Sequence, residues 1–147
     1  MGKKLTVWRS DKMLELLNGD LSNELKHMHF YLYHASTVKG LYREEIREFL
    51  LEEAGSEMKH VHEFQNLIIG LGGSPTTKAN PFKCWTDAYT ILKDALAMEE
   101  EVVDNYTERI EQGAQLLDKT NARWLEVFLE EQIMNSRTDA DNIRQML

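Results

Sequence analysis

The stretch GLGGSPTTKANP, residues 70–81, is the one clear interruption in this sequence and decides its fold. It holds both prolines of the chain, Pro75 and Pro81, together with three glycines. Proline and glycine end helices and mark turns. On either side of the stretch, apolar residues recur every three or four positions, which is the spacing of one face of a helix. The sequence therefore predicts helices before and after a long irregular link.

Two helices are predicted before the link. The first takes Ser10 or Asp11 as its N-cap, runs to about Lys39 and ends at Gly40, because Ser and Asp side chains accept hydrogen bonds from a first turn and glycine suits a C-terminal cap. The second covers about 42–71. Their apolar stripes predict these inward residues: Leu14, Leu17, Leu21, Leu25, Met28 and Leu32, then Phe49, Leu50, Met58, Val61, Phe64 and Ile68.

Two more helices are predicted after the link. The third begins at Thr86 or Asp87 and reaches about Gly113, and the fourth begins with Asn121 as its cap and continues nearly to Leu147. The expected inward residues of the third are Leu92, Leu96, Val103 and Ile110. Short first and third connections make neighbouring helices antiparallel, and the long middle link permits a crossover. We expect an all-α fold, a single-domain antiparallel four-helix bundle over residues 1–147 with a long crossover between helices two and three.

Composition narrows the class of function. The 147 residues contain 17 basic and 25 acidic side chains, a net charge of −8, which gives a nucleic-acid partner no electrostatic help. The single cysteine, Cys84, excludes an intramolecular disulfide framework. No stretch approaches the roughly 20 apolar residues of a membrane span, and charged side chains interrupt residues 1–12 where a signal peptide would be apolar. We expect a cytoplasmic protein without nucleic-acid or membrane partners.

A polar residue stands near the midpoint of every predicted helix: Glu24, Glu57, Glu99 and Gln132. Antiparallel helices of equal length bring their midpoints to one height, and the apolar neighbours of these residues indicate that they point inward. His60 lies three residues after Glu57, on the same helix face. A buried charge is costly unless it is paired or binds a metal. The spacing therefore predicts a polar layer inside the bundle.

This layer suits divalent cations. Clustered carboxylates without cations repel one another and keep their protons. Two divalent ions would neutralise them, and carboxylates with an imidazole suit Fe(II) or Mn(II). A Glu-x-x-His pair alone is usually a surface feature, so the agreement of three helices carries the prediction. The alternative from spacing is a hydrogen-bonded polar network without metal.

At these residues the sequence resembles the ferritin and bacterioferritin superfamily over nearly its whole length. Four segments carry the resemblance, one in each predicted helix: Leu21–Leu25 followed by Tyr31, Glu57–His60, Leu96–Glu99 and Leu129–Gln132. The resemblance implies a di-iron carboxylate protein that oxidises Fe(II) with O2 or H2O2 for iron storage or detoxification. Two metals roughly 3.5–4 Å apart can bind both atoms of such an oxidant.

The resemblance also implies a role for each residue. Glu24 and His60 belong chiefly to separate metals, and Glu57 bridges them. Glu99 binds the second metal with support from Gln132. The expected site is unequal, with Glu24, Glu57 and His60 as its firmer half. Tyr31 is the expected catalytic residue, as a hydrogen-bond donor or electron source beside the metals.

The fourth helix departs from bacterioferritins. They carry a second Glu-x-x-His motif there, and this sequence has Gln132 and Asn135 at those places. Neither is a strong iron ligand, so the second metal is expected to be held loosely. Glu131 is a rival ligand if the helix is rotated slightly. On the first helix His27 follows Glu24 by three residues, and we interpret it as a buried imidazole paired to a carboxylate, with an extra metal ligand as the alternative.

Further expectations concern haem and assembly. Met58 stands where bacterioferritins present a methionine to a shared haem, and we interpret it as a core or interface methionine, with a haem ligand as the alternative. His29, His34 and His62 are expected to be surface or interface residues. The sequence ends with the fourth helix at Leu147 and has no short fifth helix, which argues against a 24-subunit shell. We expect a homo-oligomer of at least two chains, with a smaller shell, a dimer and a decamer-like ring as the alternatives. The sequence lacks the ligand pattern of DNA-protecting mini-ferritins.

Two other functions remain open from the sequence. One is a di-iron or di-manganese redox enzyme of peroxidase or oxidase type without mineral storage. The rubrerythrin version of it is weakened because no Cys-x-x-Cys motif is present. The other is a metal-free helical interaction protein.

Overall fold

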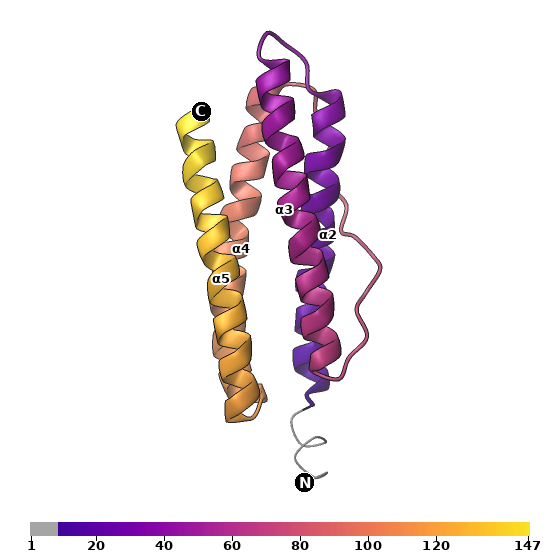
Figure 1. Ribbon diagram of the computed structural model, residues 1–147, viewed down its shortest axis with the longest axis vertical. Coiled ribbons are helices and arrows are strands. Elements are labelled where there is room, and N and C mark those ends of the chain that lie inside the picture. The colour runs from indigo at the N-terminus through magenta and orange to yellow at the C-terminus, as the bar shows by residue number, and fades with distance from the viewer. Residues whose placement is uncertain (1–8) are drawn as a thin grey trace.

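Four long helices form the bundle in the computed structural model, which describes residues 9–147 (Figure 1). They are α2 (Asp11–Thr37), α3 (Arg43–Gly70), α4 (Ala88–Leu116) and α5 (Lys119–Met146). The predicted all-α bundle with a long crossover between its second and third helices is confirmed. The expectation that the first twelve residues contain no signal peptide falls largely outside the described residues. No described helix is long and apolar enough to cross a membrane.

Short polar side chains begin three of the helices. Ser10 accepts a hydrogen bond from the Met13 N–H (3.1 Å), as the sequence predicts for α2. Asp87 does the same for the Thr90 N–H (2.9 Å) at the start of α4. The prediction of Asn121 as the cap of α5 is wrong, since Asp118 accepts the N–H of Asn121 and α5 begins at Lys119. Asp and Asn both suit an N-cap, so the sequence alone did not distinguish a start at Asp118 from one at Asn121, about one turn later.

The predicted end of the third helix at Gly113 is early, since α4 continues to Leu116. Gly113 lies inside the helix, and a Cβ there would stand only 2.6 Å from Leu125 Cδ2 of α5. The glycine allows α4 and α5 to pack closely rather than ending the helix.

The crossover link of residues 71–87 runs along the bundle beside α2 (Figure 1). Hydrogen bonds tie it to α2 at three heights: Thr76 N–H to Asn18 (2.8 Å), Asn80 N–H to the Ser22 carbonyl (3.1 Å), and Trp85 N–H to His34 (3.0 Å). A further backbone bond joins the Lys39 N–H to the Thr86 carbonyl (2.8 Å). The link therefore fixes the start of α4 against the end of α2.

His34 is fully buried, so the prediction of a surface or interface residue is wrong. Its Nδ1 donates to the Phe30 carbonyl (2.8 Å), which leaves Nε2 to accept the Trp85 N–H. This requires the neutral ring, and burial lowers the pKa of His34 accordingly. His34 is a structural anchor for the link.

The apolar core is divided in two along the bundle. One part, with Leu17, Phe64 and Leu125, lies toward the N-terminal end of α2. The other, with Phe30 and Leu50, lies toward its C-terminal end. Between the two parts each helix contributes buried polar residues, so the predicted polar layer does sit inside the bundle.

Two predicted inward residues lie on the outside. Leu32 is 52% exposed and Met58 is 63% exposed. Met58 therefore does not fill the core, and it lines a groove on α2 and α3 with Leu25 and Met28. The apolar stripes of α2 and α3 extend onto outer sides of these helices that no other part of the described chain covers.

Candidate metal centre

The polar layer is built from all four helices. The structure places Glu24 of α2, Glu57 and His60 of α3, Glu99 of α4 and Gln132 of α5 in the interior, each at most 6% exposed. Glu131, the rival ligand, is exposed on α5 and belongs to none of the candidate metal groups of the described residues.

Glu24, Glu57 and His60 form the first group. Each offers a ligand atom, and these atoms lie within 4.8 Å of one another. His60 Nδ1 lies 3.5 Å from Glu57 Oε2 and 3.9 Å from Glu24 Oε2. Glu24 and His60 therefore surround one position, whereas the resemblance assigned them chiefly to separate metals.

His27, Glu57 and Glu99 form the second group, again with ligand atoms within 4.8 Å. His27 is buried and its Nδ1 has no hydrogen-bond partner, so the carboxylate partner expected from the sequence is not found among the described residues. Burial lowers the pKa of His27 to about 3, which keeps the ring neutral. Because Glu57 belongs to both groups, it can bridge two cations.

Glu53, Glu99 and Asp139 form a third group. Glu53 and Asp139 are not among the residues predicted from the sequence. Their spacing could have revealed them, since Glu53 lies one helical turn before Glu57 and Asp139 lies one turn after Asn135.

Two tyrosines hold the outer oxygens of the carboxylates. Tyr31 of α2 donates its hydroxyl hydrogen bond to Glu99 Oε1 of α4 (2.9 Å). Tyr106 of α4 donates to Glu24 Oε1 of α2. Tyr31 follows Glu24 by seven residues and Tyr106 follows Glu99 by seven, so the arrangement is close to two-fold symmetric. Tyr106 is not among the residues predicted from the sequence, although this repeated spacing is a signal for it.

The central carboxyl groups lack compensating charge. Burial, together with the neighbouring carboxylates, raises the pKa of Glu57 to about 8. It raises the pKa values of Glu24 and Glu99 well above the usual range. No lysine or arginine of the described residues forms an ion pair with these three. Asp20 one turn away differs, because Arg109 binds both of its oxygens (2.7 and 2.9 Å).

The residues present fit a set of divalent cations. Six buried side chains of the layer each have an atom without a hydrogen-bond partner: Glu24 Oε2, His27 Nδ1, Glu53 Oε2, Glu57 Oε2, Glu99 Oε2 and Gln132 Oε1. An unpartnered buried polar atom is costly, so a native structure needs a reason for it. Cations bound by these oxygen and nitrogen atoms would supply that reason, and the donor types suit Fe(II) or Mn(II).

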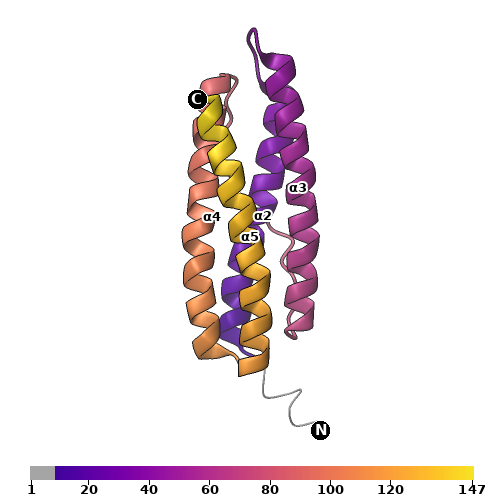
Figure 2. The same cartoon turned by 60° about the vertical axis from the view of Figure 1, so that its left-hand side comes forward.

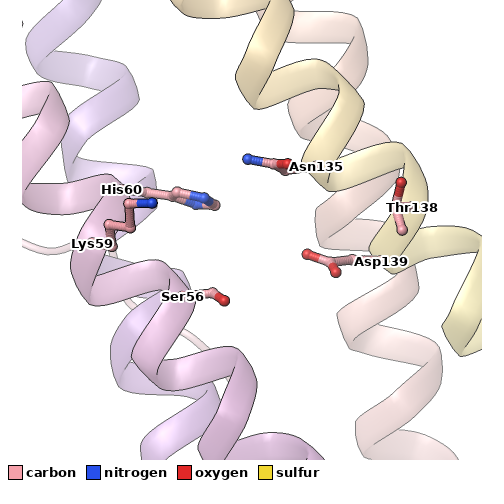
Figure 3. Close-up of a pocket in the computed structure, with 6 residues that line it drawn as sticks. All are labelled: Ser56, Lys59, His60, Asn135, Thr138 and Asp139. Carbon is pink, nitrogen blue, oxygen red and sulfur yellow. The ribbon is translucent and has the colours of Figure 1, made fainter.

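A pocket of about 310 Å³ between α3 and α5 reaches this layer (Figure 3). His60 projects into it from α3, and Asn135 and Asp139 face His60 from α5 (Figure 3). The turned view shows α5 and α3 at the same height in the bundle (Figure 2). His60 belongs to both the pocket wall and the first metal group, so the pocket adjoins the centre.

Without metal, the protein should become less stable as the pH rises from 6.5 to 8.5. Glutamates ionise near pH 4.5 in the unfolded chain, whereas Glu57 and Glu53 keep their protons in the folded state up to about pH 8. The stability that these groups contribute is full below about pH 4.5, falls as the pH rises from there, and is lost once the pH passes about 8. His27 opposes this trend only at the lower end of the range, because its imidazole has a pKa of 6.5 in the unfolded chain and is neutral in both states from about pH 7.5.

We expect the melting temperature in the presence of a chelator to fall by roughly 10 °C over this range. Circular dichroism would measure it, and Glu57→Gln, which removes one of the titrating groups, should reduce the fall. Saturating Co(II) should remove most of the dependence. A melting temperature that stays constant or rises in chelator would contradict the electrostatic description.

Comparison with known proteins shows which family and which solved structures this chain is similar to. The model of the family described as ferritin-like domain matches residues 14–146. A ferritin-like diiron-carboxylate protein from Bacillus anthracis str. Ames is 32% identical, with 92% of this chain and 95% of that chain covered and a TM-score of 0.84. Among curated protein sequences, no significant match is found.

Two bacterioferritin structures share the fold at lower identity. Mycobacterium tuberculosis bacterioferritin BfrA is 19% identical, with coverage of 95% and 86% and a TM-score of 0.82. The Rhodobacter capsulatus bacterioferritin, with a metal-free dinuclear site and haem iron, is 22% identical, with coverage of 93% and 84% and a TM-score of 0.80.

Proposed function

This chain belongs to the ferritin-like domain family, and from that premise we propose that it binds two Fe(II) ions in its polar layer and oxidises them with O2 or H2O2. The observation that carries the proposal is the set of unpartnered ligand atoms around Glu57, which two candidate groups share. Iron is the substrate of this reaction, and the product is ferric iron for storage or detoxification.

The first Fe(II) would be held by Glu24, Glu57 and His60. The second would be held by Glu57, Glu99 and His27, and the unpartnered amide oxygen of Gln132 is a further candidate donor. Tyr31 and Tyr106 donate hydrogen bonds to the outer oxygens of Glu99 and Glu24 and so orient the remaining oxygens inward. His27 offers a neutral ring nitrogen, which partly replaces the imidazole that α5 lacks.

The electron and proton balance is simple. Two Fe(II) ions give one electron each to O2, which takes up two protons and leaves as H2O2. With H2O2 as the oxidant, two electrons and two protons break the O–O bond and give two water molecules. The carboxyl groups with raised pKa values hold protons before iron binds, and binding displaces those protons. Tyr31, whose pKa burial raises well above its usual range, stays protonated and keeps its hydrogen bond to Glu99.

Anaerobic loading followed by exposure to oxygen tests this function. We expect at least two Fe(II) bound per chain, and rapid oxidation with about one O2 consumed per two Fe(II), as the balance above requires. Ferric iron that stays in solution beyond this amount would indicate storage. Less than about 0.1 iron or manganese per chain would overturn the proposal and favour a metal-free interaction protein. Fast oxidation of Mn(II) but not Fe(II) would favour the manganese enzyme.

We also propose that the chain forms a homo-oligomer of at least two copies. The support is the groove of about 650 Å³ along α2 and α3, in which Met58 is exposed and Leu25 and Met28 are half-buried within one chain. Light scattering would measure the mass in solution, and a monomer at micromolar concentration would refute the proposal. Red protein with a Soret band would assign Met58 to haem, and colourless protein would leave it as an interface residue.

A further inference from the structure

We propose that Glu53, Glu99 and Asp139 hold a third divalent cation beside the paired centre, with Glu99 shared between them. The three residues come from α3, α4 and α5, and their ligand oxygens lie within 4.8 Å of one another. Neither Glu53 nor Asp139 is part of the segments that carry the family resemblance. The inference rests on the proposed function, because Glu99 also belongs to the second Fe(II) position.

Acidic groups cluster without metals on many protein surfaces, but this cluster is largely buried. Glu99 is fully buried and Glu53 is 9% exposed, and an oxygen of each has no hydrogen-bond partner. No lysine or arginine of the described residues forms an ion pair with any of the three carboxylates. The fold does pair a buried carboxylate elsewhere, at Asp20 and Arg109, so the missing counter-charge at Glu53 is a specific feature of this position.

The charge balance of the whole layer favours a third cation. Glu24, Glu53, Glu57, Glu99 and Asp139 carry five negative charges when all are ionised. Two divalent cations supply four positive charges and leave one negative charge. We assign the remaining negative charge to the third group, because Glu53 and Asp139 belong to neither of the other two groups. A further divalent cation there would neutralise that charge and give the unpartnered Glu53 Oε2 a partner.

The third group also lies on the path from solvent. Asp139 is half-buried and faces the pocket between α3 and α5, opposite His60 (Figure 3). Asp139 belongs to the third group and His60 to the first, so a cation in this pocket meets ligands of both. We infer that the third position receives Fe(II) from the pocket and passes it to Glu99.

The ligand types distinguish this position from the other two. All three donors are carboxylates, which favour hard cations such as Mn(II) and Mg(II), whereas His60 and His27 give the paired positions an imidazole each. The third position should therefore bind Co(II) more weakly than the other two, and Mg(II) should compete for it selectively.

Anomalous scattering from crystals soaked in Co(II) tests the inference directly. In the wild-type protein we expect three peaks, one beside each group. Glu53→Gln and Asp139→Asn should each remove the third peak and retain the other two. Equilibrium dialysis should show the same loss as about one Co(II) fewer per chain. Both substitutions keep the side-chain shape and remove a repelling charge, so the variants should fold, which thermal melting in chelator would check.

Matched controls are available on the same helices. Glu52→Gln and Asp141→Asn make the same charge changes at exposed positions beside Glu53 and Asp139, and they should retain all three peaks. Peaks at the first two positions and none at the third in the wild type would overturn this inference and leave the proposed function standing. A third peak that persists in both Glu53→Gln and Asp139→Asn would also overturn it. No peak at any position would refute the proposed function itself.

Discussion

Replacing Glu57 by alanine should abolish fast oxidation of Fe(II), with an initial rate roughly 100-fold or more below that of the wild type. Glu57 is the one residue shared by the first and second groups, so its loss removes a ligand from both positions. His60→Ala should have a similar effect, because His60 is the only imidazole of the first group. Stopped-flow absorbance of ferric iron after mixing with oxygen would measure both rates.

The bundle should remain folded in both variants. Glu57 Oε2 has no hydrogen-bond partner, and burial raises the pKa of its carboxyl group to about 8, so the metal-free protein gains little from this side chain. Melting temperatures in chelator should therefore stay within a few degrees of the wild type. Glu48→Ala, an exposed change on the same helix, is the matched control and should keep the wild-type rate. Unchanged oxidation in both Glu57→Ala and His60→Ala would refute the site assignment.

The double change Gln132→Glu with Asn135→His should strengthen binding of the second cation by on the order of 100-fold. It would give α5 the Glu-x-x-His motif that α3 already has at Glu57 and His60. Gln132 is buried with its Oε1 unpartnered, so a carboxylate there would point into the layer. Asn135 faces the pocket opposite His60, which leaves room for an imidazole (Figure 3).

Competition titration with Co(II) against a chromophoric chelator would measure the two affinities. The first should change little, and the second should approach it. In the absence of metal the variant should be less stable than the wild type above neutral pH, since it buries another carboxyl group. Asn142→His with Gln145→Glu makes the same two replacements on exposed positions of α5 and should leave both affinities unchanged. An unaltered second affinity in the layer variant would contradict the assignment of Gln132.

Much of the centre was accessible from the sequence, because helical spacing is a local property. Glu24, Glu57 and Glu99 share a face with apolar neighbours, and each is buried as that pattern predicts. Local spacing does not predict burial where a neighbouring element determines whether a side chain is covered. Leu32 and Met58 follow the apolar stripe, yet no part of the described chain covers them, and both are exposed. The sequence predicted His34 as a surface or interface residue. It is buried because the link packs over it, and its hydrogen-bond partner Trp85 lies 51 residues later in the sequence.

The sequence by itself determined the four helices, the long crossover at residues 70–81 and the inward faces of three glutamates, since a period of 3.6 residues and the breaks at proline and glycine need no partner. Only the tertiary structure decided which ligands meet. It grouped Glu24 with His60, left His27 without the expected carboxylate partner, and brought Glu53 and Asp139 beside Glu99. Those pairings depend on the rotation and separation of helices distant in sequence, which packing across the bundle sets.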